Sequence, residues 1–346
     1  MDLQTSKRTG RYAPVLDTRE TETAIKKIKD FFEVRLAEAL NLRRITAPLF
    51  VPAGTGINDD LNGVEQPVSF PIKDLGGRRA EIVQSLAKWK RLMLADLGMG
   101  PGEGIYADMN AIRPDETLDC LHSIYVDQWD WERTMLEEER NLDFLKEVVR
   151  TIYHVLLAAE EYLRGLYPGI GCLLPGNIAF VHAEDLQERY PDLDPREREN
   201  RIAEEHGAVF IIGIGASLNG GLPHDGRAPD YDDWISPNGR GRGLNGDIIL
   251  WYPVLGRAFE ISSMGIRVTP RTLEEQLAIR NQVGRRSLFF HQRLLRGELP
   301  CSVGGGIGQS RLCMYLLRKA HIGEVQAGLW PDEMVRECRQ NNIVLL

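Results

Sequence analysis

The sequence predicts an α+β fold with a mainly antiparallel sheet flanked by helices. Runs rich in β-branched and aromatic residues, typical of strands, recur along the chain at residues 80–84, 104–113, 123–131, 177–182, 208–214, 247–255 and 258–263. Helical patterns are grouped between these runs and do not alternate with them one for one. This order favours an antiparallel sheet over a doubly wound parallel one.

The chain shows no internal division. No Pro/Gly/Ser-rich linker, repeat, low-complexity tract or shift in composition interrupts its 346 residues, which suffice for a large buried core. We therefore expect a single domain over residues 17–346. Residues 1–16 are polar and lack periodicity, and we expect them to form a flexible N-terminal arm.

The first helix and strand have clear signals. Asp17 to Glu20 has the spacing of a capping box, and apolar residues then recur at intervals of three and four, at Ile25, Ile28, Phe32, Leu36 and Leu40. Ile45 to Val51 reads as a strand that Pro48 interrupts. Because proline cannot donate a hydrogen bond to a neighbouring strand, we expect this strand at an edge or interface.

Four further helices are expected downstream. A long amphipathic pattern covers residues 134–166, and Pro195 to His206 is a highly charged segment with proline at its first turn. Shorter helical patterns follow at residues 272–283 and 287–296. The first two lie between predicted strands, and the last two follow the strand at 258–263.

The strand at 123–131 carries an unusual pattern that continues to Glu132. Because side chains alternate along a strand, Gln128, Asp130 and Glu132 share one face, and Trp129 and Trp131 share the other. A ladder of acids and amides is costly inside a protein unless a ligand or metal satisfies it. The pattern therefore predicts either a binding site or a strand face in contact with solvent.

Composition excludes several classes of protein. The net charge of −8 argues against a nucleic-acid partner, which requires a concentrated basic surface. The first 20 residues lack an apolar signal core, and the chain has no apolar run of the length of a membrane span. Five cysteines without a CxxC pair suit a reducing compartment. We expect a cytoplasmic protein without a membrane partner.

Three separated segments together resemble the catalytic domain of class II aminoacyl-tRNA synthetases. Arg113 and Glu116 match the second motif of that family, and the glycine loop that ends in Arg311 matches the third. The Gln128 strand matches the subgroup specific for Asp, Asn and Lys, as does the segment that begins with Gln84 and Ser85. The resemblance implies that ATP is bound by Arg113, Glu116, Gly304, Gly305, Gly306, Gly308 and Arg311.

A longer series of motifs resembles the asparagine synthetase A family of ammonia-dependent aspartate–ammonia ligases. SLAKWKR, HSIYVDQWDWER, RAPDYDDW, LNGDI, SSMGIR and GGGIGQSR occur in this order between residues 85 and 311. The resemblance implies a ligase that amidates L-aspartate with ammonia through a β-aspartyl-adenylate, releasing AMP and pyrophosphate. Its partners would be ATP, L-aspartate and ammonia, and the proline-bearing strand would lie at a homodimer interface.

The resemblance also implies roles for individual residues. Asp247 and Glu260 would hold Mg²⁺, because hard oxygen ligands suit that ion, with solvent-facing strand acids as the alternative. Lys90 and Arg267 would grip the non-reacting carboxylate of aspartate. Hydrogen bonds would come from Gln84, Ser85 and Ser263, and the α-ammonium and incoming ammonia would meet Asp59, Gln128, Asp130 and Asp232.

Asp59 is the candidate for the base that deprotonates ammonium, and Arg113 and Arg311 are the candidates for stabilising the reacting phosphate. Without the resemblance, the loop around Asp59 is explained better by turn chemistry. Two other functions stay open: an enzyme that loads aspartate or asparagine onto tRNA, and a non-catalytic relative. The acidic charge and the lack of chain length for an anticodon-binding module weigh against the first. The complete set of ATP residues weighs against the second.

Overall fold

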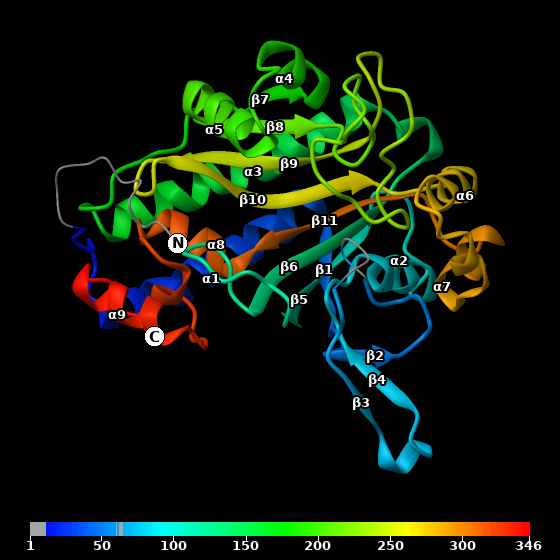
Figure 1. The fold of residues 1–346 in the computed structure, drawn as a ribbon, viewed down its shortest axis with the longest axis horizontal. Coiled ribbons are helices and arrows are strands. Elements are labelled where there is room, and N and C mark those ends of the chain that lie inside the picture. Colours follow the sequence, from blue (N-terminus) through cyan, green and yellow to red (C-terminus); the bar gives the residue numbers. More distant parts are fainter. Residues whose placement is uncertain (1–11, 60, 62–64) are drawn as a thin grey trace.

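The computed structural model describes residues 12–59, 61 and 65–346, and an eight-stranded sheet forms its centre (Figure 1). The strands run in the order β1 (Leu42–Arg44), β5 (Gly104–Ile112), β6 (Tyr125–Thr134), β11 (Ser302–Gly308), β10 (Arg257–Ile266), β9 (Asn245–Tyr252), β8 (Ala208–Ile212) and β7 (Ala179–His182). Only the outer pairs β1–β5 and β7–β8 are parallel among these strands. The predicted α+β fold with a mainly antiparallel sheet is confirmed.

The largest hydrophobic core lies on one face of this sheet. Helices α1 (Thr18–Leu40), α3 (Leu142–Leu166) and α8 (Gln309–Leu316) cover that face, and Figure 1 shows α1 and α3 running along the sheet. Trp129 and Trp131 are fully buried in this core, as their alternation with the acidic residues predicted. Gln128, Asp130 and Glu132 of β6 therefore face the other side of the sheet.

A smaller core lies on that opposite face. Val209, Ile211 and Ile249 pack there against α4 (Ala183–Arg189) and α5 (Pro195–His206), whereas Phe210 and Ile248 belong to the large core. The charged helix has the bounds that the sequence predicts. Both faces of the sheet are therefore covered at the β8–β9 end.

The prediction of one strand over Ile45–Val51 is wrong. Strand β1 ends at Arg44, and β2 (Phe50–Pro52) belongs to a separate three-stranded sheet with β4 (Arg79–Ile82) and β3 (Ser69–Pro71). Pro48 lies between the two strands, where its missing N–H prevents a continuous ladder. The small sheet projects from the body (Figure 1).

The remaining helices lie at two ends of the molecule. Helices α2 (Ala87–Asp96), α6 (Pro270–Ile279) and α7 (Phe289–Leu295) lie at one end and α9 (Asp332–Gln340) at the other (Figure 1). The capping box at Asp17 is present at the start of α1. Pro270 in the first turn starts α6, two residues before the predicted start.

The expected N-terminal arm lies largely outside the described residues, which begin at Tyr12. The hydroxyl of Tyr12 donates to Glu324 (3.0 Å), and Lys319 donates to the carbonyl of the buried Leu16 (3.1 Å). Residues 12–16 are thus in contact with the domain. In the described part of the chain, no helix has the length and apolar character needed to cross a membrane.

Candidate active site

A cavity of about 360 Å³ lies against the polar face of the sheet, over β6, β11 and β10. Most residues expected at the site contribute to its wall: Asp59, Ser85, Lys90, Arg113, Glu116, Gln128, Asp130, Asp232, Glu260, Ser263, Arg267, Gly305, Gly306, Gly308 and Arg311. Gln84, Asp247 and Gly304 are buried behind this wall and do not line it. The structure therefore brings most of the predicted residues to one place.

The glycines at 304–308 form a strand, which corrects the expected glycine loop. In β11, Gly304 pairs with Glu132, Gly306 with Asp130 and Gly308 with Gln128. A Cβ atom on Gly304 would lie 1.9 Å from Oε2 of Glu132, and one on Gly306 would lie 2.3 Å from Oε1 of Gln128. Only glycine leaves room for the polar side chains of β6.

Arg267 lies at the centre of a buried ionic cluster. Its Nη2 donates to Oε2 of Glu132 (2.7 Å), and its Nη1 forms a short ion pair with Asp232. Ser302 completes the coordination of Glu132 by donating to Oε1 (2.7 Å). Burial would raise the pKa of Glu132, but Arg267 overrides it, and the pKa lies below its usual range.

Helix α2 brings a second cation to the cavity. Nζ of Lys90 donates to the Gly305 carbonyl (2.8 Å) and lies 3.4 Å from Oδ2 of Asp130. Burial lowers the pKa of Lys90, and Asp130 opposes that shift. Gln84 precedes the helix with a buried side-chain amide that has no hydrogen-bond partner among the described residues. A ligand is the ordinary way to satisfy such a group.

The predicted ATP residues line another part of the wall. Arg113 directs Nη2 to the Gln84 carbonyl (3.0 Å), and its buried Nε has no partner in the described chain. Arg311 stands at the start of α8, with Nη1 3.7 Å from Oε2 of Glu260. Both planar guanidinium groups can thus donate to phosphate oxygens from the cavity wall.

Asp247 and Glu260 lie on adjacent strands β9 and β10, as expected. A β-bulge between Glu260 and Ser262 turns Glu260 to the same side as Ser263, so both line the cavity. Burial raises the pKa of Asp247 to about 8, and the nearby Glu260 adds to the shift although Arg227 lowers it. Two crowded carboxylates beside the cavity fit a divalent cation.

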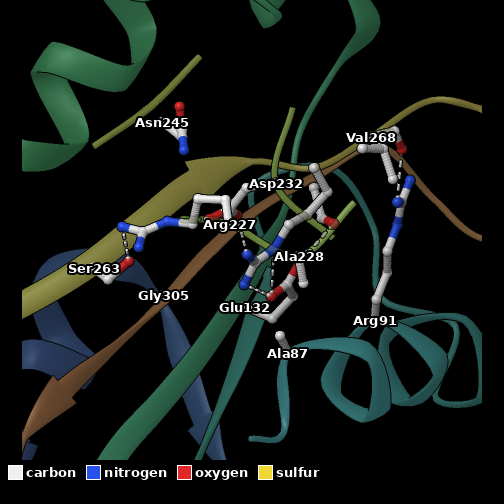
Figure 2. A network of polar contacts seen from close by, with 12 residues as sticks. Ala87, Arg91, Glu132, Arg227, Ala228, Asp232, Asn245, Ser263, Val268 and Gly305 are labelled. Atoms are coloured by element: carbon white, nitrogen blue, oxygen red, sulfur yellow. Dashed lines mark hydrogen bonds and ion pairs between the residues drawn. The ribbon is translucent and has the colours of Figure 1, made fainter. Parts of the chain in front are cut away.

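Arg227 is a cavity residue that the sequence reasoning missed. It forms a short ion pair with Asp247 and donates from Nη2 to Oγ of Ser263 (2.8 Å), and Figure 2 shows it reaching from near Asp232 toward Ser263. It is the first residue of RAPDYDDW. That motif contributed to the resemblance, but periodicity gave its arginine no separate signal.

Asp59 lies on the cavity wall with only 2% of its surface exposed. Its Oδ1 accepts from the N–H of Leu61 (3.1 Å), and the preceding Asn58 accepts from the N–H of Gln84 (2.8 Å). Burial raises the pKa of Asp59 above its usual range, although Lys88 and Arg113 lower it in part. Asp59 therefore lies on the same cavity wall as Lys90, Arg113 and Asp130.

A second missed group fixes the start of α8. Asp127 accepts from the N–H (3.0 Å) and the hydroxyl (2.8 Å) of Ser310, and Lys29 donates to it (3.0 Å). Gln326 donates to the Ser310 hydroxyl (3.1 Å). Because Arg311 directly follows Ser310, this network fixes the backbone position from which the Arg311 side chain extends.

Comparison with known proteins gives a consistent assignment. Residues 19–342 match the family described as aspartate–ammonia ligase. The chain is 58% identical over 336 residues to the aspartate–ammonia ligase of Bacteroides fragilis, with 97% of both chains covered. It is 59% identical over 337 residues to that of Parabacteroides distasonis, again with 97% of both chains covered.

Among solved structures, the fold is similar to asparaginyl-tRNA synthetase from Pyrococcus horikoshii complexed with asparaginyl-adenylate. The TM-score is 0.68 over 90% of this chain and 70% of that chain, at 16% sequence identity. This likeness concerns the fold alone and confirms the predicted class II architecture. Together with the matches over nearly the whole sequence, it leads to one conclusion: the chain belongs to the aspartate–ammonia ligase family.

Proposed function

We propose that this protein catalyses the ATP-dependent amidation of L-aspartate by ammonia to L-asparagine, through a β-aspartyl-adenylate. The membership of the family supports the overall reaction. The observation that carries the mechanism is that one cavity holds two separate pairs of cations, Arg113 with Arg311 and Lys90 with Arg267. The first pair suits phosphate and the second suits a carboxylate.

In the first step, a β-carboxylate oxygen of aspartate attacks the α-phosphorus of ATP. A new P–O bond forms, the bond to the β-phosphate oxygen breaks, and pyrophosphate leaves with its electrons. Catalysis of this step is mainly positioning and charge stabilisation. Arg113 and Arg311 would provide both, because their guanidinium groups line the same wall from two different elements.

Asp247 and Glu260 are the residues that would hold Mg²⁺. When bound, the ion would neutralise charge on the triphosphate. Arg227 would keep the carboxylate of Asp247 oriented toward Ser263 and the cavity, because it contacts both. Asp247, one of the two proposed ligands, therefore has a fixed partner within the chain.

The α-carboxylate of aspartate would lie against Lys90 and Arg267, which leaves the β-carboxylate free to react. Ser85 and Ser263 would add hydrogen bonds from the cavity wall, whereas Gln84, whose amide has no hydrogen-bond partner in the described chain, lies behind that wall. Gln128, Asp130 and Asp232 would surround the α-ammonium group. In this orientation, each charged group of the substrate lies next to protein groups of opposite charge.

In the second step, ammonia attacks the β-carbonyl carbon of the adenylate, the C–O bond to AMP breaks, and AMP leaves with the bonding electrons. As the amide forms, the attacking nitrogen gives up one proton to the departing phosphate or to solvent. Ammonia is mostly ammonium at neutral pH, so a base must take one proton. We assign this role to Asp59, whose buried carboxylate lies on the cavity wall. Asp59→Asn should leave aspartate-dependent pyrophosphate exchange intact and slow the ammonia step by about 10²–10⁴.

Hydroxylamine provides a direct check on this role, because it is neutral near pH 7 and needs no proton removed before attack. It should partly restore turnover of Asp59→Asn. A parallel loss of exchange and synthesis would instead place Asp59 at the α-ammonium group.

The proposal includes a homodimer of single-domain subunits in the cytoplasm, without nucleic acid as partner. The exposed Phe50 of β2 and the exposed Leu49 directly before it suit a subunit interface. All five cysteines lie in the described chain and are free thiols, which suits the reducing cytoplasm. Sedimentation at micromolar concentration should give about twice the mass of one 39.1 kDa chain, and a monomer would contradict the dimer.

The reaction itself is tested by product analysis with aspartate, ammonium, ATP and Mg²⁺, with and without tRNA. AMP and pyrophosphate should form together with asparagine, and tRNA should have no effect. ADP as the main product would overturn the adenylate mechanism. Transfer of the amino acid to tRNA would favour the synthetase alternative.

A further inference from the structure

A buried charged cluster lies outside the cavity, next to the loop of Asp59. At its centre, Oδ2 of Asp230 accepts from Nζ of Lys88 (3.0 Å), Nη1 of Arg285 (3.0 Å) and Nε2 of His291 (3.1 Å). Asp230 and His291 are fully buried, and Lys88 is 1% exposed. Burial would raise the pKa of Asp230, but Lys88 and His291 lower it to about 2. Asp230 is therefore a fixed anion.

The Asp59 loop packs against this cluster. The carbonyl of Thr55 accepts from the N–H of Phe290 (3.2 Å), directly before His291. A Cβ atom on Gly56 would lie 3.0 Å from Nδ1 of His291, so the loop passes over the imidazole. The charge that most strongly affects Asp59 is Lys88, followed by Asp230. Lys88 thus lies within electrostatic range of two carboxylates.

These two carboxylates compete for one ammonium group. Lys88 donates to Asp230, which is buried outside the cavity, whereas Asp59 lines the cavity. We propose that Asp230, supported by His291, is a positioning residue that holds the Lys88 ammonium away from Asp59 and so keeps the Asp59 carboxylate free to receive ammonium. The inference rests on the proposed role of Asp59.

The physical reason is that a carboxylate in a full ion pair is a weak base. An opposite charge at contact distance lowers a carboxyl pKa by roughly 1–3 units, and it occupies the oxygens that ammonium must reach. Burial raises the pKa of Asp59, which favours proton transfer near neutral pH. A direct bond from Lys88 would cancel this effect.

The other charged and titratable groups near Asp59 are Arg113, Arg285 and Tyr231. Arg113 donates to the Gln84 carbonyl, and Arg285 donates to Asp230. Burial raises the pKa of Tyr231 far above its usual range, so its hydroxyl is neutral. Lys88 is the cation with the largest charge effect on Asp59, and Arg285, which shares Asp230 with it, is the second cation that Asp230 holds.

The test compares Asp230→Asn, Lys88→Met and the double variant in the full-length protein, with ammonium and hydroxylamine as nucleophiles. Asp230→Asn releases Lys88, so kcat/KM for ammonium should fall by at least about tenfold. In the plot of kcat/KM against pH, the acidic limb should move to lower pH by about one unit. Pyrophosphate exchange should stay within about twofold of wild type, since the ATP residues are unchanged. Lys88→Met should move the acidic limb of the same plot to higher pH.

The double variant provides the decisive measurement. Removing Lys88 should restore kcat/KM for ammonium in the Asp230→Asn background, because the competing cation is gone. It also removes both charges of a buried pair, which a protein tolerates better than the loss of one. Glu160→Gln serves as a matched control, because its buried pair with Arg318 (2.9 Å) does not line the cavity. It should alter stability only.

The outcomes separate this inference from the role of Asp59. If Asp59→Asn leaves the ammonium step unchanged, the proposed base is wrong and the inference fails with it. If Asp59→Asn slows that step but the double variant shows no recovery, Asp59 is the base and Asp230 acts only structurally. Should Asp230→Asn fail to fold, an unshifted acidic limb in Lys88→Met overturns the inference.

Discussion

Replacing Glu132 by glutamine should destabilise the whole domain, although Glu132 lies beside the cavity. The carboxylate receives three hydrogen bonds from Arg267, two from Nε (2.9 and 3.1 Å) and one from Nη2 (2.7 Å), and a fourth from Ser302. Both charged side chains are almost fully buried. Loss of one charge leaves Arg267 with a single anionic partner, Asp232.

The expected cost is about 3–5 kcal/mol, the range for breaking a buried ion pair by changing one partner. The lower end applies, because Asp232 still balances Arg267 and the glutamine oxygen can still accept one hydrogen bond. For a chain of this length, about 3–5 kcal/mol corresponds to a decrease in Tm of roughly 4–7 °C. Differential scanning calorimetry at fixed protein concentration measures this decrease.

A matched exposed pair provides the control. Arg271 donates to Glu275 one helical turn away (2.7 Å), with both side chains about half exposed or more. Glu275→Gln should change stability by less than about 1 kcal/mol. If both variants melt within 1 °C of wild type, the cluster around Arg267 does not hold the sheet together, and our reasoning about it is refuted.

Three further predictions follow from the same contacts. Arg311→Ala should raise the barrier of pyrophosphate exchange by about 3–4 kcal/mol while the fold survives, and near-normal exchange would remove Arg311 from the phosphate site. Gly306→Ala should raise KM for aspartate more than for ATP, because its Cβ would meet Gln128 at 2.3 Å and Asp130 at 2.7 Å; Gly165→Ala, with no atom within 4 Å, is the control, and equal effects would contradict the clash. Because the folded-state pKa of Glu132 is depressed, its stabilising effect should be present above about pH 4.3 and be lost as pH falls through the folded-state pKa. The stability difference between wild type and Glu132→Gln should shrink there, and a constant difference in denaturant titrations would disprove this linkage.

Much of the fold could be predicted because its signals are local. The alternation of Trp129 and Trp131 with acidic residues defines two faces of one strand, and the capping box at Asp17 and the proline at Pro195 mark helix starts. Strand β11 escaped prediction because three consecutive glycines have low strand propensity. Glycine is required there because the polar side chains of the neighbouring strand occupy the space that a larger residue would need.

The sequence could predict which residues belong to the site but not which of them contact one another. The resemblance identified Lys90 and Arg267 as cations, but only the structure shows that each already contacts a carboxylate. The Lys88–Asp230 pair joins residues 142 positions apart, so no local pattern could indicate it. The β-bulge that turns Glu260 toward the cavity likewise depends on strand pairing.

The pairing of these cations has a consequence for substrate recognition. Arg267 faces Glu132 and Asp232, Lys90 faces Asp130, and Arg227 lies 4.0 Å from Asp232, so each cation of the proposed aspartate pocket already faces a carboxylate. An incoming carboxylate alone would add negative charge to a buried site whose cations are already balanced by carboxylates. The α-ammonium group of aspartate offsets this charge, because it can approach Asp130 and Asp232 while the α-carboxylate approaches the two cations. On the proposed roles, the pocket therefore selects a zwitterion, and the ammonium group is needed for binding although it takes no part in the reaction.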